Sequence, residues 1–360
     1  MTSVTDLDLS ADTVSLLEQL VNIESVSLNE QPIADAVEAA LRPLAHLEVT
    51  RHGNTVVART ALGHGERVVV AGHLDTVPIN DNLPAVLDQS NGRDVLRGLG
   101  TCDMKGGVAV MLKLAATVPS PNRDVTFLFY ECEEIEEERN GLRRLSETDA
   151  DLMRADFAIL MEPSDAVIEA GCQGNLRVDV TTRGERAHTA RSWMGVNAIH
   201  RAGEILDRLN AYEARKPVID GLEYHEGLNA VSITGGVAGN VLPDACTIQV
   251  NHRFAPDRSE AEATAYVQEV FDGFEVTVVD SAPGALPGLD RPAAKEFVAA
   301  VGGEVNPKFG WTDVARFSAL GMPAVNFGPG DPMLAHKQEE FVPIEHVARC
   351  EAVMRTWLGG

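Results

Sequence analysis

The sequence has no apolar run that approaches the ~20 residues needed for a membrane-spanning helix. Its first residues have neither a basic region nor the apolar core of a signal peptide. These two absences predict a cytoplasmic protein. Five cysteines, at positions 102, 132, 172, 246 and 350, form no CxxC pair, so we expect no disulfide framework.

Basic residues are also scarce. Lys and Arg number 30 against 54 Asp and Glu, and the formal net charge is −24. This balance argues against nucleic acid and anionic membranes, because both are bound through basic surfaces. An anionic small molecule remains possible where arginines gather, and part of the acidity can belong to a metal site. The chain has no internal repeat or low-complexity tract.

Four short apolar runs each lead to a residue that can bind a metal ion. Such runs are typical of strands buried on both faces, and in open α/β sheets the functional crevice lies beyond the carboxyl ends of the strands. The runs are 68–72, 125–130, 157–161 and 323–327, and the candidates that follow them are His73, Asp75, Glu133, Glu134, Glu162 and His336. Asp103, in the glycine-framed loop 98–107, is a further candidate. The pattern predicts a site for a pair of divalent ions.

The periodicity of the two ends of the chain predicts a mostly parallel α/β sheet with helices on both faces. A first helix is expected after Ser10, which can act as its N-cap, and a buried helix is expected at 107–116. Residues 1–175 and 286–360 are expected to form this catalytic domain. The remaining expected elements are a helix at 32–44 and strands at 47–50, 55–59 and 67–71, and the parallel α/β pattern is expected to resume at 291–301.

Residues 176–285 have a different pattern, which predicts an inserted α+β domain with antiparallel strands. Strands are expected at 177–182, 247–254 and 274–279, and one amphipathic helix at 196–209. In the strand 247–254 one face is expected to carry Ile248, Val250, His252 and Phe254. The other face is polar and includes Arg253.

The individual residue types suit metal-assisted hydrolysis. His73 and Asp75 lie two apart on a strand end, so they point the same way and Asp75 can fix the tautomer of His73. Asp103 can bridge two ions ~3.5–4 Å apart, although a surface turn would also explain it. Glu133 and Glu134 belong to six glutamates at positions 131–138, where a solvated helix start is the alternative. Of such a pair, one residue can bind metal while the other accepts a proton from water.

The motifs together resemble the M20 family of dinuclear zinc amidohydrolases. They are 72–78 (GHLDTVP), 103–106 (DMKG), 133–134 (EE), 162–163 (EP) and 335–337 (AHK), in this order and across nearly the whole chain. The resemblance implies two Zn²⁺ ions per subunit, for which Co²⁺ can substitute, bridged by Asp103. It assigns His73 and Glu162 to one ion and Glu134 and His336 to the other. It also makes Glu133 the general base and Asp75 the support of His73.

The resemblance further implies that 176–285 is a lid and dimerisation domain. Lids of the family form homodimers and lend a histidine to the neighbouring active site. His188, in 184–190 (GERAHTA), matches that residue and would stabilise the oxyanion. Asn240, in 239–244 (GNVLPD), resembles a lid residue that reaches the substrate.

Two further motifs, 310–317 (GWTDVARF) and 326–332 (NFGPGDP), resemble the branch of the family that hydrolyses N-succinyl-LL-2,6-diaminopimelate in lysine and cell-wall precursor synthesis. An anionic substrate of this kind requires cationic or amide donors. The expected substrate-binding residues are Arg253, Asn240, Thr312, Arg316, Asn326 and Gly328. An alternative is the activity of relatives that act on acetylornithine, acylated amino acids or short peptides. A different class of function is a non-catalytic metal-binding scaffold. Cys102 and Cys132 adjoin the proposed site and are expected to be buried thiols.

Overall fold

The computed structural model describes residues 6–359, and these divide into two compact units. Of the described residues, unit 1 comprises 6–170, 287–306 and 316–359, and unit 2 comprises 171–286 and 307–315. No helix within the described residues is long and apolar enough to cross a membrane.

Unit 1 contains an eight-stranded sheet in the order β1-β2-β6-β3-β7-β16-β8-β15. Its centre is parallel, because β3 pairs in parallel with β6 and β7, and β7 pairs in parallel with β16. The strands are β1 (Glu48–His52), β2 (Thr55–Arg59), β3 (Arg67–His73), β6 (Asp124–Tyr130), β7 (Phe157–Leu160), β8 (Ile168–Ala170), β15 (Val305–Pro307, whose last residue belongs to unit 2) and β16 (Ala324–Asn326). Strands β6 and β7 are buried at every position, as their continuous apolar sequences predict.

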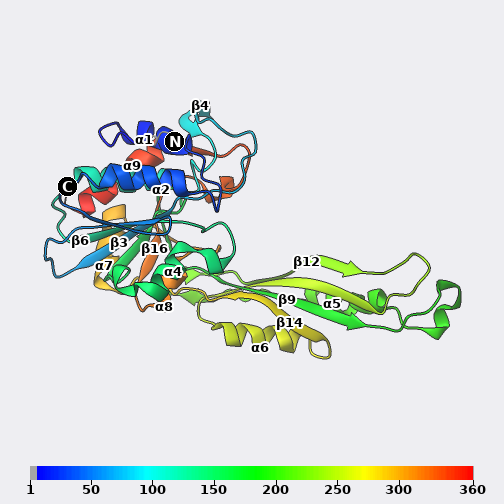
Figure 1. The fold of residues 1–360 in the computed structure, drawn as a ribbon. Coiled ribbons are helices and arrows are strands. Elements are labelled where there is room, and N and C mark those ends of the chain that lie inside the picture. The colour runs from blue at the N-terminus through cyan, green and yellow to red at the C-terminus, as the bar shows by residue number, and fades with distance from the viewer. Residues whose placement is uncertain (1–5, 360) are drawn as a thin grey trace. The chain divides into compact units, whose positions relative to one another are not determined.

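Helices cover this sheet, and Figure 1 shows α1, α2 and α9 above its strands and α4 below them. The predicted α/β architecture is therefore confirmed. The helices of unit 1 are α1 (Thr13–Val21), α2 (Gln31–Leu41), α3 (Lys105–Thr117), α4 (Gly141–Thr148), α7 (Pro292–Val301), α8 (Val314–Ala319, whose first two residues belong to unit 2) and α9 (Ile344–Trp357). Helix α1 begins later than expected: Asp12, not Ser10, is its N-cap and accepts hydrogen bonds from the backbone N–H groups of Val14 and Ser15.

A small antiparallel sheet in unit 1 has the order β17-β5-β4. Its strands are β4 (Val86–Ser90), β5 (Arg93–Arg97) and β17 (Phe341–Pro343). The loop 98–104 runs from the end of β5 to the start of α3, and the segment with His336 precedes β17. The pairing of Phe341 with Arg97 therefore brings these two segments side by side.

Unit 2 is built on a four-stranded antiparallel sheet in the order β12-β13-β9-β14. In β13, Ile248, Val250, His252 and Phe254 are buried and alternate with half-buried polar residues, as the sequence predicts. The elements are β9 (Gly174–Arg183), α5 (Ala198–Asn210), β10 (Val218–Ile219), β11 (Leu222–Glu223), β12 (Gly227–Gly235), β13 (Ala245–Phe254), α6 (Glu260–Val270) and β14 (Glu275–Ala282). Apolar residues of α5 and α6 complete its core.

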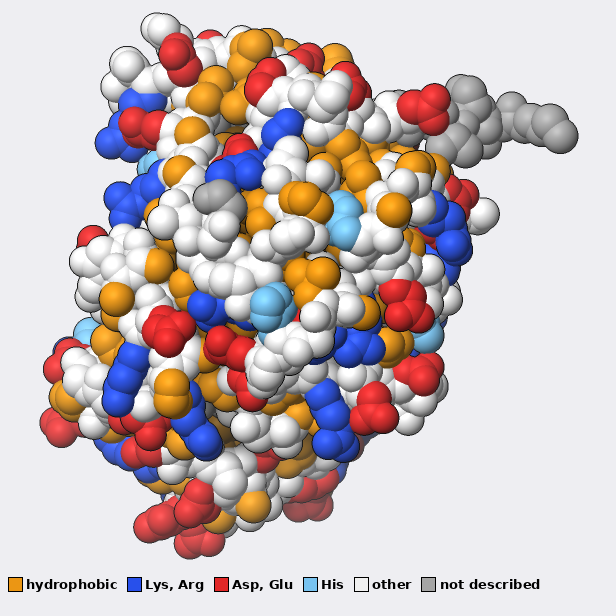
Figure 2. All heavy atoms as spheres, turned by 90° about the vertical axis from the view of Figure 1, so that its left-hand side faces the viewer, with side chains coloured by type: hydrophobic (Ala, Val, Ile, Leu, Met, Phe, Trp, Pro, Cys, Tyr) orange, Lys and Arg blue, Asp and Glu red, His pale blue; other side chains and the backbone are white. Residues whose placement is uncertain are grey.

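The acidic residues do not form a uniform surface. On the face shown in Figure 2, Lys and Arg side chains are interspersed among Asp and Glu side chains. Exposed charges of the chain form ion pairs, for example Arg154 with Asp151 and Arg183 with Glu275. Exposed pairs of this kind contribute little to stability, so the net charge bears more on solubility than on fold.

Candidate metal centre

The four predicted apolar runs are neighbours in the sheet of unit 1. They form β6, β3, β7 and β16, which are parallel and adjacent, so their carboxyl ends lie at one edge. His73 ends β3 opposite Tyr130 at the end of β6, and Leu160 ends β7 beside Ala71. The chain after each of these strands carries candidate ligands. This edge is where open α/β sheets place their functional crevice.

The carboxylate of Asp103 belongs to two groups of candidate ligands. One group contains His73, Asp103 and Glu162, and the other contains Asp103, Glu134 and His336. Within each group the candidate ligand atoms all lie within 4.8 Å of one another. Asp103 Oδ1 lies 3.0 Å from His73 Nε2, and Asp103 Oδ2 lies 3.6 Å from His336 Nε2. One carboxylate oxygen therefore faces each histidine, which is the arrangement that a bridging ligand requires.

The glutamates of the run 131–138 differ in burial. Glu133 and Glu134 are half-buried, whereas Glu136 and Glu138 are exposed. A Glu134 oxygen lies 2.9 Å from His336 Nε2. Glu133 shares a further group with Glu134 and His73, again within 4.8 Å. Both glutamates of the predicted pair thus direct carboxylate oxygens toward the histidines.

Asp75 contacts the site in two ways. Its backbone carbonyl lies 3.0 Å from His73 Nδ1, and its carboxylate Oδ1 lies 3.6 Å from the same nitrogen. The carboxylate itself accepts hydrogen bonds from the backbone N–H groups of Glu133 and Glu134 at 3.0 and 3.1 Å, and from the Ser27 hydroxyl at 2.8 Å. The acceptor for His73 is therefore the backbone carbonyl of Asp75 and not its carboxylate, which instead holds the backbone of the glutamate loop.

The concentration of carboxylates perturbs the titration of the site. Burial lowers the pKa of His73, but the hydrogen bond to Asp103 and the charges of Glu162 and Asp75 outweigh it, so the pKa of His73 is raised. The hydrogen bond to Glu134 raises the pKa of His336 to about 9. Burial raises the pKa of Glu134, with a contribution from the Asp103 charge. A bound dication would act in the opposite direction, because metal ligands must lose their protons.

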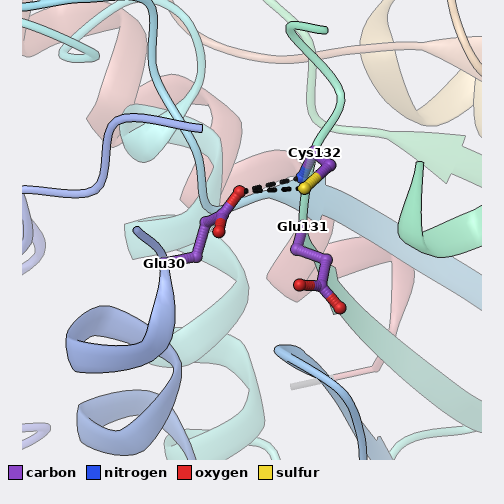
Figure 3. Close-up of side chains that lie close together, drawn as sticks. All are labelled: Glu30, Glu131 and Cys132. Carbon is purple, nitrogen blue, oxygen red and sulfur yellow. Dashed lines mark hydrogen bonds between the residues drawn. The ribbon is translucent and has the colours of Figure 1, made fainter. Parts of the chain in front are cut away.

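A fourth group, Glu30, Glu131 and Cys132, does not have the character of a metal site. Figure 3 shows the Glu30 carboxylate directed at Cys132 and the Glu131 carboxylate directed away from both. Glu30 Oε1 accepts hydrogen bonds from the backbone N–H and the thiol of Cys132, each at 3.2 Å. Glu131 forms an ion pair with Arg144 and accepts the backbone N–H of Asn54 at 2.7 Å. Glu30 thus holds the residue that precedes Glu133.

The cysteines are buried thiols, as expected. All five are free and buried. Cys102 Sγ donates to the carbonyl of Asp331 at 3.1 Å, whereas Cys132 donates to Glu30. Burial raises the pKa of both thiols, that of Cys132 to about 12. A thiol with a raised pKa has little thiolate, so neither is a reactive cysteine.

Three predicted substrate residues lie in unit 1. The Arg316 guanidinium, 11% exposed, donates to Glu137 Oε1 at 3.2 Å. Asn326 is buried in β16 and its amide donates to the carbonyl of Glu169 at 3.3 Å. The backbone N–H of Gly328 donates to the Ser164 hydroxyl at 3.0 Å. Each of these groups therefore has a partner within the protein.

The other predicted residues lie in unit 2. His188 and Asn240 are exposed and come together, because the Thr189 N–H donates to the Asn240 carbonyl at 3.0 Å. Arg253 is half-buried on the polar face of β13, and burial lowers its pKa. Thr312 is buried, and its carbonyl is 3.8 Å from the Cys172 thiol.

Sequence reasoning missed two buried residues that hold the ligand loops. Glu340 accepts three backbone N–H groups of the Asp103 loop, and Lys105 donates to the Ile23 carbonyl at 2.8 Å. Burial lowers the pKa of Lys105 to about 7 and raises that of Glu340 to about 7. Neither residue has a local signal, because Glu340 adjoins the exposed Glu339 and a lysine at a helix start is normally solvated.

Residues 69–359 match the peptidase family M20/M25/M40, so the chain belongs to this family of hydrolases. A Mycobacterium tuberculosis protein assigned as a succinyl-diaminopimelate desuccinylase is 54% identical over 357 residues, covering 98% of this chain and 100% of that protein. The succinyl-diaminopimelate desuccinylase of Corynebacterium glutamicum is 47% identical over 363 residues, covering 98% and 97%.

Solved structures agree with the fold. A tripeptidase of Staphylococcus aureus superposes with a TM-score of 0.79 at 21% identity, covering 98% of each chain. A Bacillus subtilis protein described as a dinuclear metal-binding peptidase of the M20 family gives 0.71 at 15% identity, covering 97% of each. The family resemblance drawn from the motifs is thus confirmed.

Proposed function

We propose that the protein is a zinc-dependent amidohydrolase that converts N-succinyl-LL-2,6-diaminopimelate to succinate and LL-2,6-diaminopimelate. The observation that carries the hydrolytic part is the Asp103 carboxylate, which has one oxygen toward each of the two histidines. The choice of acyl group is supported by the names of the two relatives that match nearly the whole chain. The expected cytoplasmic location stays a prediction.

The donor set fits a pair of zinc ions. Imidazole nitrogens and carboxylate oxygens, without a thiolate, suit Zn²⁺ or Co²⁺ rather than Ca²⁺. His73, Asp103 and Glu162 would hold one ion, and Asp103, Glu134 and His336 the other. When bound, such a pair polarises the amide carbonyl and lowers the pKa of the attacking water to about 7.

Glu133 is proposed as the general base. Its carboxylate lies in one group with His73 and Glu134, and its backbone is held by Asp75. It would accept the proton of the attacking water and then donate it to the departing amine. This role requires a carboxylate that does not coordinate metal through both oxygens. Glu133 meets this requirement because it is outside the two groups that share Asp103.

The predicted substrate-binding residues are proposed to bind the substrate carboxylates. The planar guanidinium of Arg253 suits bidentate binding of a carboxylate. His188 would stabilise the oxyanion. The remaining proposed contacts are Asn240, Thr312, Arg316, Asn326 and Gly328.

A homodimer through unit 2 is part of the proposal. Strand β12 is at the edge of its sheet and exposes Val231 and Ile233, which are 56% and 55% exposed. An exposed apolar edge strand is a surface prone to pair with a second chain. We expect sedimentation to report a dimer, and a monomer at micromolar concentration would contradict a role for His188 in a neighbouring site.

The decisive experiment offers the zinc-loaded protein N-succinyl-LL-2,6-diaminopimelate and N-acetylornithine side by side. We expect a higher kcat/KM for the succinyl substrate. A higher value for the acetyl substrate would replace the assignment with a deacetylase. A chain that binds zinc and hydrolyses neither of them, nor short peptides, would instead support a non-catalytic scaffold.

A further inference from the structure

Glu340 lies four residues after His336, just before β17, and its side chain is 1% exposed. Its carboxylate accepts three hydrogen bonds from one loop. Oε2 accepts the backbone N–H of Gly100 at 3.1 Å, and Oε1 accepts those of Cys102 and Asp103 at 2.8 and 3.1 Å. A single buried carboxylate therefore fixes the backbone on which the shared ligand Asp103 stands.

This loop depends on an acceptor supplied from elsewhere in the chain. It turns through Gly100, which has a φ of +77°, and it leads into α3 without a side-chain cap. A buried N–H group left without an acceptor loses its hydrogen bond to water without replacement, which is unfavourable. An ionised carboxylate has two oxygens and about four acceptor sites, so it can serve all three donors. The amide of a glutamine has one acceptor oxygen and would direct its own N–H groups at some of them.

The same residue also joins the loop to the His336 segment. The Glu340 backbone carbonyl accepts the Gly98 N–H at 3.1 Å. The Arg97 guanidinium donates to the Glu339 carbonyl at 2.9 Å. Backbone and side chain of residues 339–340 thus tie the segment carrying His336 to the loop carrying Asp103, and both of these ligands belong to one of the two groups.

We infer that Glu340 is a positioning residue of the metal centre: it holds the Asp103 loop and the His336 segment in the geometry that two metal ions need. This inference rests on the proposed dinuclear site. It assigns Glu340 no contact with substrate or metal. Residues that orient metal ligands from outside typically contribute 10–100-fold to metal affinity.

Asp124 offers a matched control. It is also a buried carboxylate that holds a loop, and it accepts the backbone N–H groups of Leu62, Gly63 and His64 at 2.8, 3.1 and 3.0 Å. It begins β6, whereas the ligand-bearing segment follows the other end of that strand, about 20 Å away at ~3.3 Å per residue. Asp124→Asn should therefore disturb a loop in the same way without disturbing the ligands.

The experiment titrates metal-free full-length wild type, Glu340→Gln and Asp124→Asn with Zn²⁺ by calorimetry, and records the visible spectrum of each after Co²⁺ loading. We expect Glu340→Gln to bind zinc 10–100-fold more weakly and to show an altered Co²⁺ spectrum. Asp124→Asn should have a lower Tm but keep the wild-type affinity and spectrum. Wild-type affinity and spectrum in Glu340→Gln, or an equal loss of affinity in both variants, would overturn the inference.

Glu340→Asp provides a second test, which also applies when Glu340→Gln does not fold. Aspartate keeps the charge and both oxygens but is one methylene shorter. We expect the zinc affinity of Glu340→Asp to lie between those of wild type and Glu340→Gln. If Glu340→Gln does not fold, we expect the affinity of Glu340→Asp to be lower than that of wild type. Wild-type affinity in Glu340→Asp would contradict the inference in that case. A wild type that binds no zinc would instead overturn the metal centre of the proposed function.

Discussion

The carboxylate of Asp75 accepts a hydrogen bond from the backbone N–H of Glu133 at 3.0 Å. The end of β3 therefore holds the proposed general base, which follows β6. The other oxygen of Asp75 accepts the N–H of Glu134 at 3.1 Å, so the proposed base and the neighbouring ligand share one support. Asp75 is completely buried, which removes water as an alternative partner.

Asp75→Asn should lower kcat/KM by about 10–100-fold. One oxygen becomes an NH₂ group, which would face the N–H of Glu133 or Glu134 instead of accepting it. Ser27→Ala is a milder control, because it removes one hydrogen-bond donor to the same carboxylate. It should raise the activation free energy by only about 1 kcal/mol. Steady-state kinetics with the succinyl substrate measures both effects. Wild-type kcat/KM in Asp75→Asn would show that the glutamate loop needs no such support.

Glu133→Gln should lower kcat by about 10²–10⁴-fold, the usual contribution of a general base. Zinc binding should be retained, because Glu133 lies outside the two groups that share Asp103. Glu138→Gln is the matched control: it lies in the same acidic run but is exposed, and its kcat should not change. Zinc titration and turnover are measured on the same preparations. If Glu133→Gln keeps its kcat, another residue is the base.

The grouping of the candidate ligands at one sheet edge was predictable from sequence, because four short apolar runs each lead into a segment that carries an imidazole or carboxylate side chain. The choice of Glu133 and Glu134 from six glutamates followed from their position just beyond a strand, and in the structure these two lie in a group with His73. The order of the strands in the sheet could not be predicted from the sequence. The position of β3 between β6 and β7 depends on packing between residues that are far apart in the chain.

The supports of the site could not be predicted. Glu340 and Asp103 are 237 residues apart, and Glu340 adjoins an exposed glutamate with the same local sequence. Burial, which distinguishes the two, is a property of the folded chain. The N-cap of α1 was also not predictable. Ser10 and Asp12 are both good capping residues, and the sequence alone does not show at which of them the helix begins.

Gly328→Ala should destabilise unit 1 by at least about 1–3 kcal/mol, the usual cost of overpacking. A Cβ at Gly328 would lie 2.2 Å from the Met161 carbonyl oxygen and 2.5 Å from that of Glu162. The strand end that carries a proposed ligand would have to move, so zinc affinity should fall as well. Calorimetric Tm and zinc titration measure the two effects.

Gly203→Ala is the control for Gly328→Ala, because it should increase stability where Gly328→Ala decreases it. Gly203 lies inside α5, and a Cβ there would meet nothing within 4 Å. Alanine should stabilise the helix by up to about 1 kcal/mol. An unchanged Tm and zinc affinity in Gly328→Ala would mean that the backbone at Gly328 can move away from the backbone of Met161 and Glu162 without loss of stability.

His252 predicts a pH dependence of stability that originates in unit 2. Its Nδ1 lies 3.0 Å from the Gly227 carbonyl and is therefore the protonated nitrogen, while Nε2 is buried with no hydrogen-bond partner among the described residues. Burial lowers the pKa of His252. The Gly227 carbonyl and Glu226 oppose that shift, and Arg258 and Arg215 add to it.

A histidine whose pKa is lower in the folded than in the unfolded chain stabilises the fold above the unfolded value of about 6.5, and this contribution is lost as the pH falls toward the folded pKa. His252→Asn keeps a donor near Nδ1 but cannot titrate. Urea unfolding of both proteins at pH 7.5 and 5.5 should therefore show wild type losing more stability than His252→Asn, by at most about 1.4 kcal/mol per pH unit below 6.5. Equal losses in the two proteins would mean that protonated His252 is accommodated in the folded state.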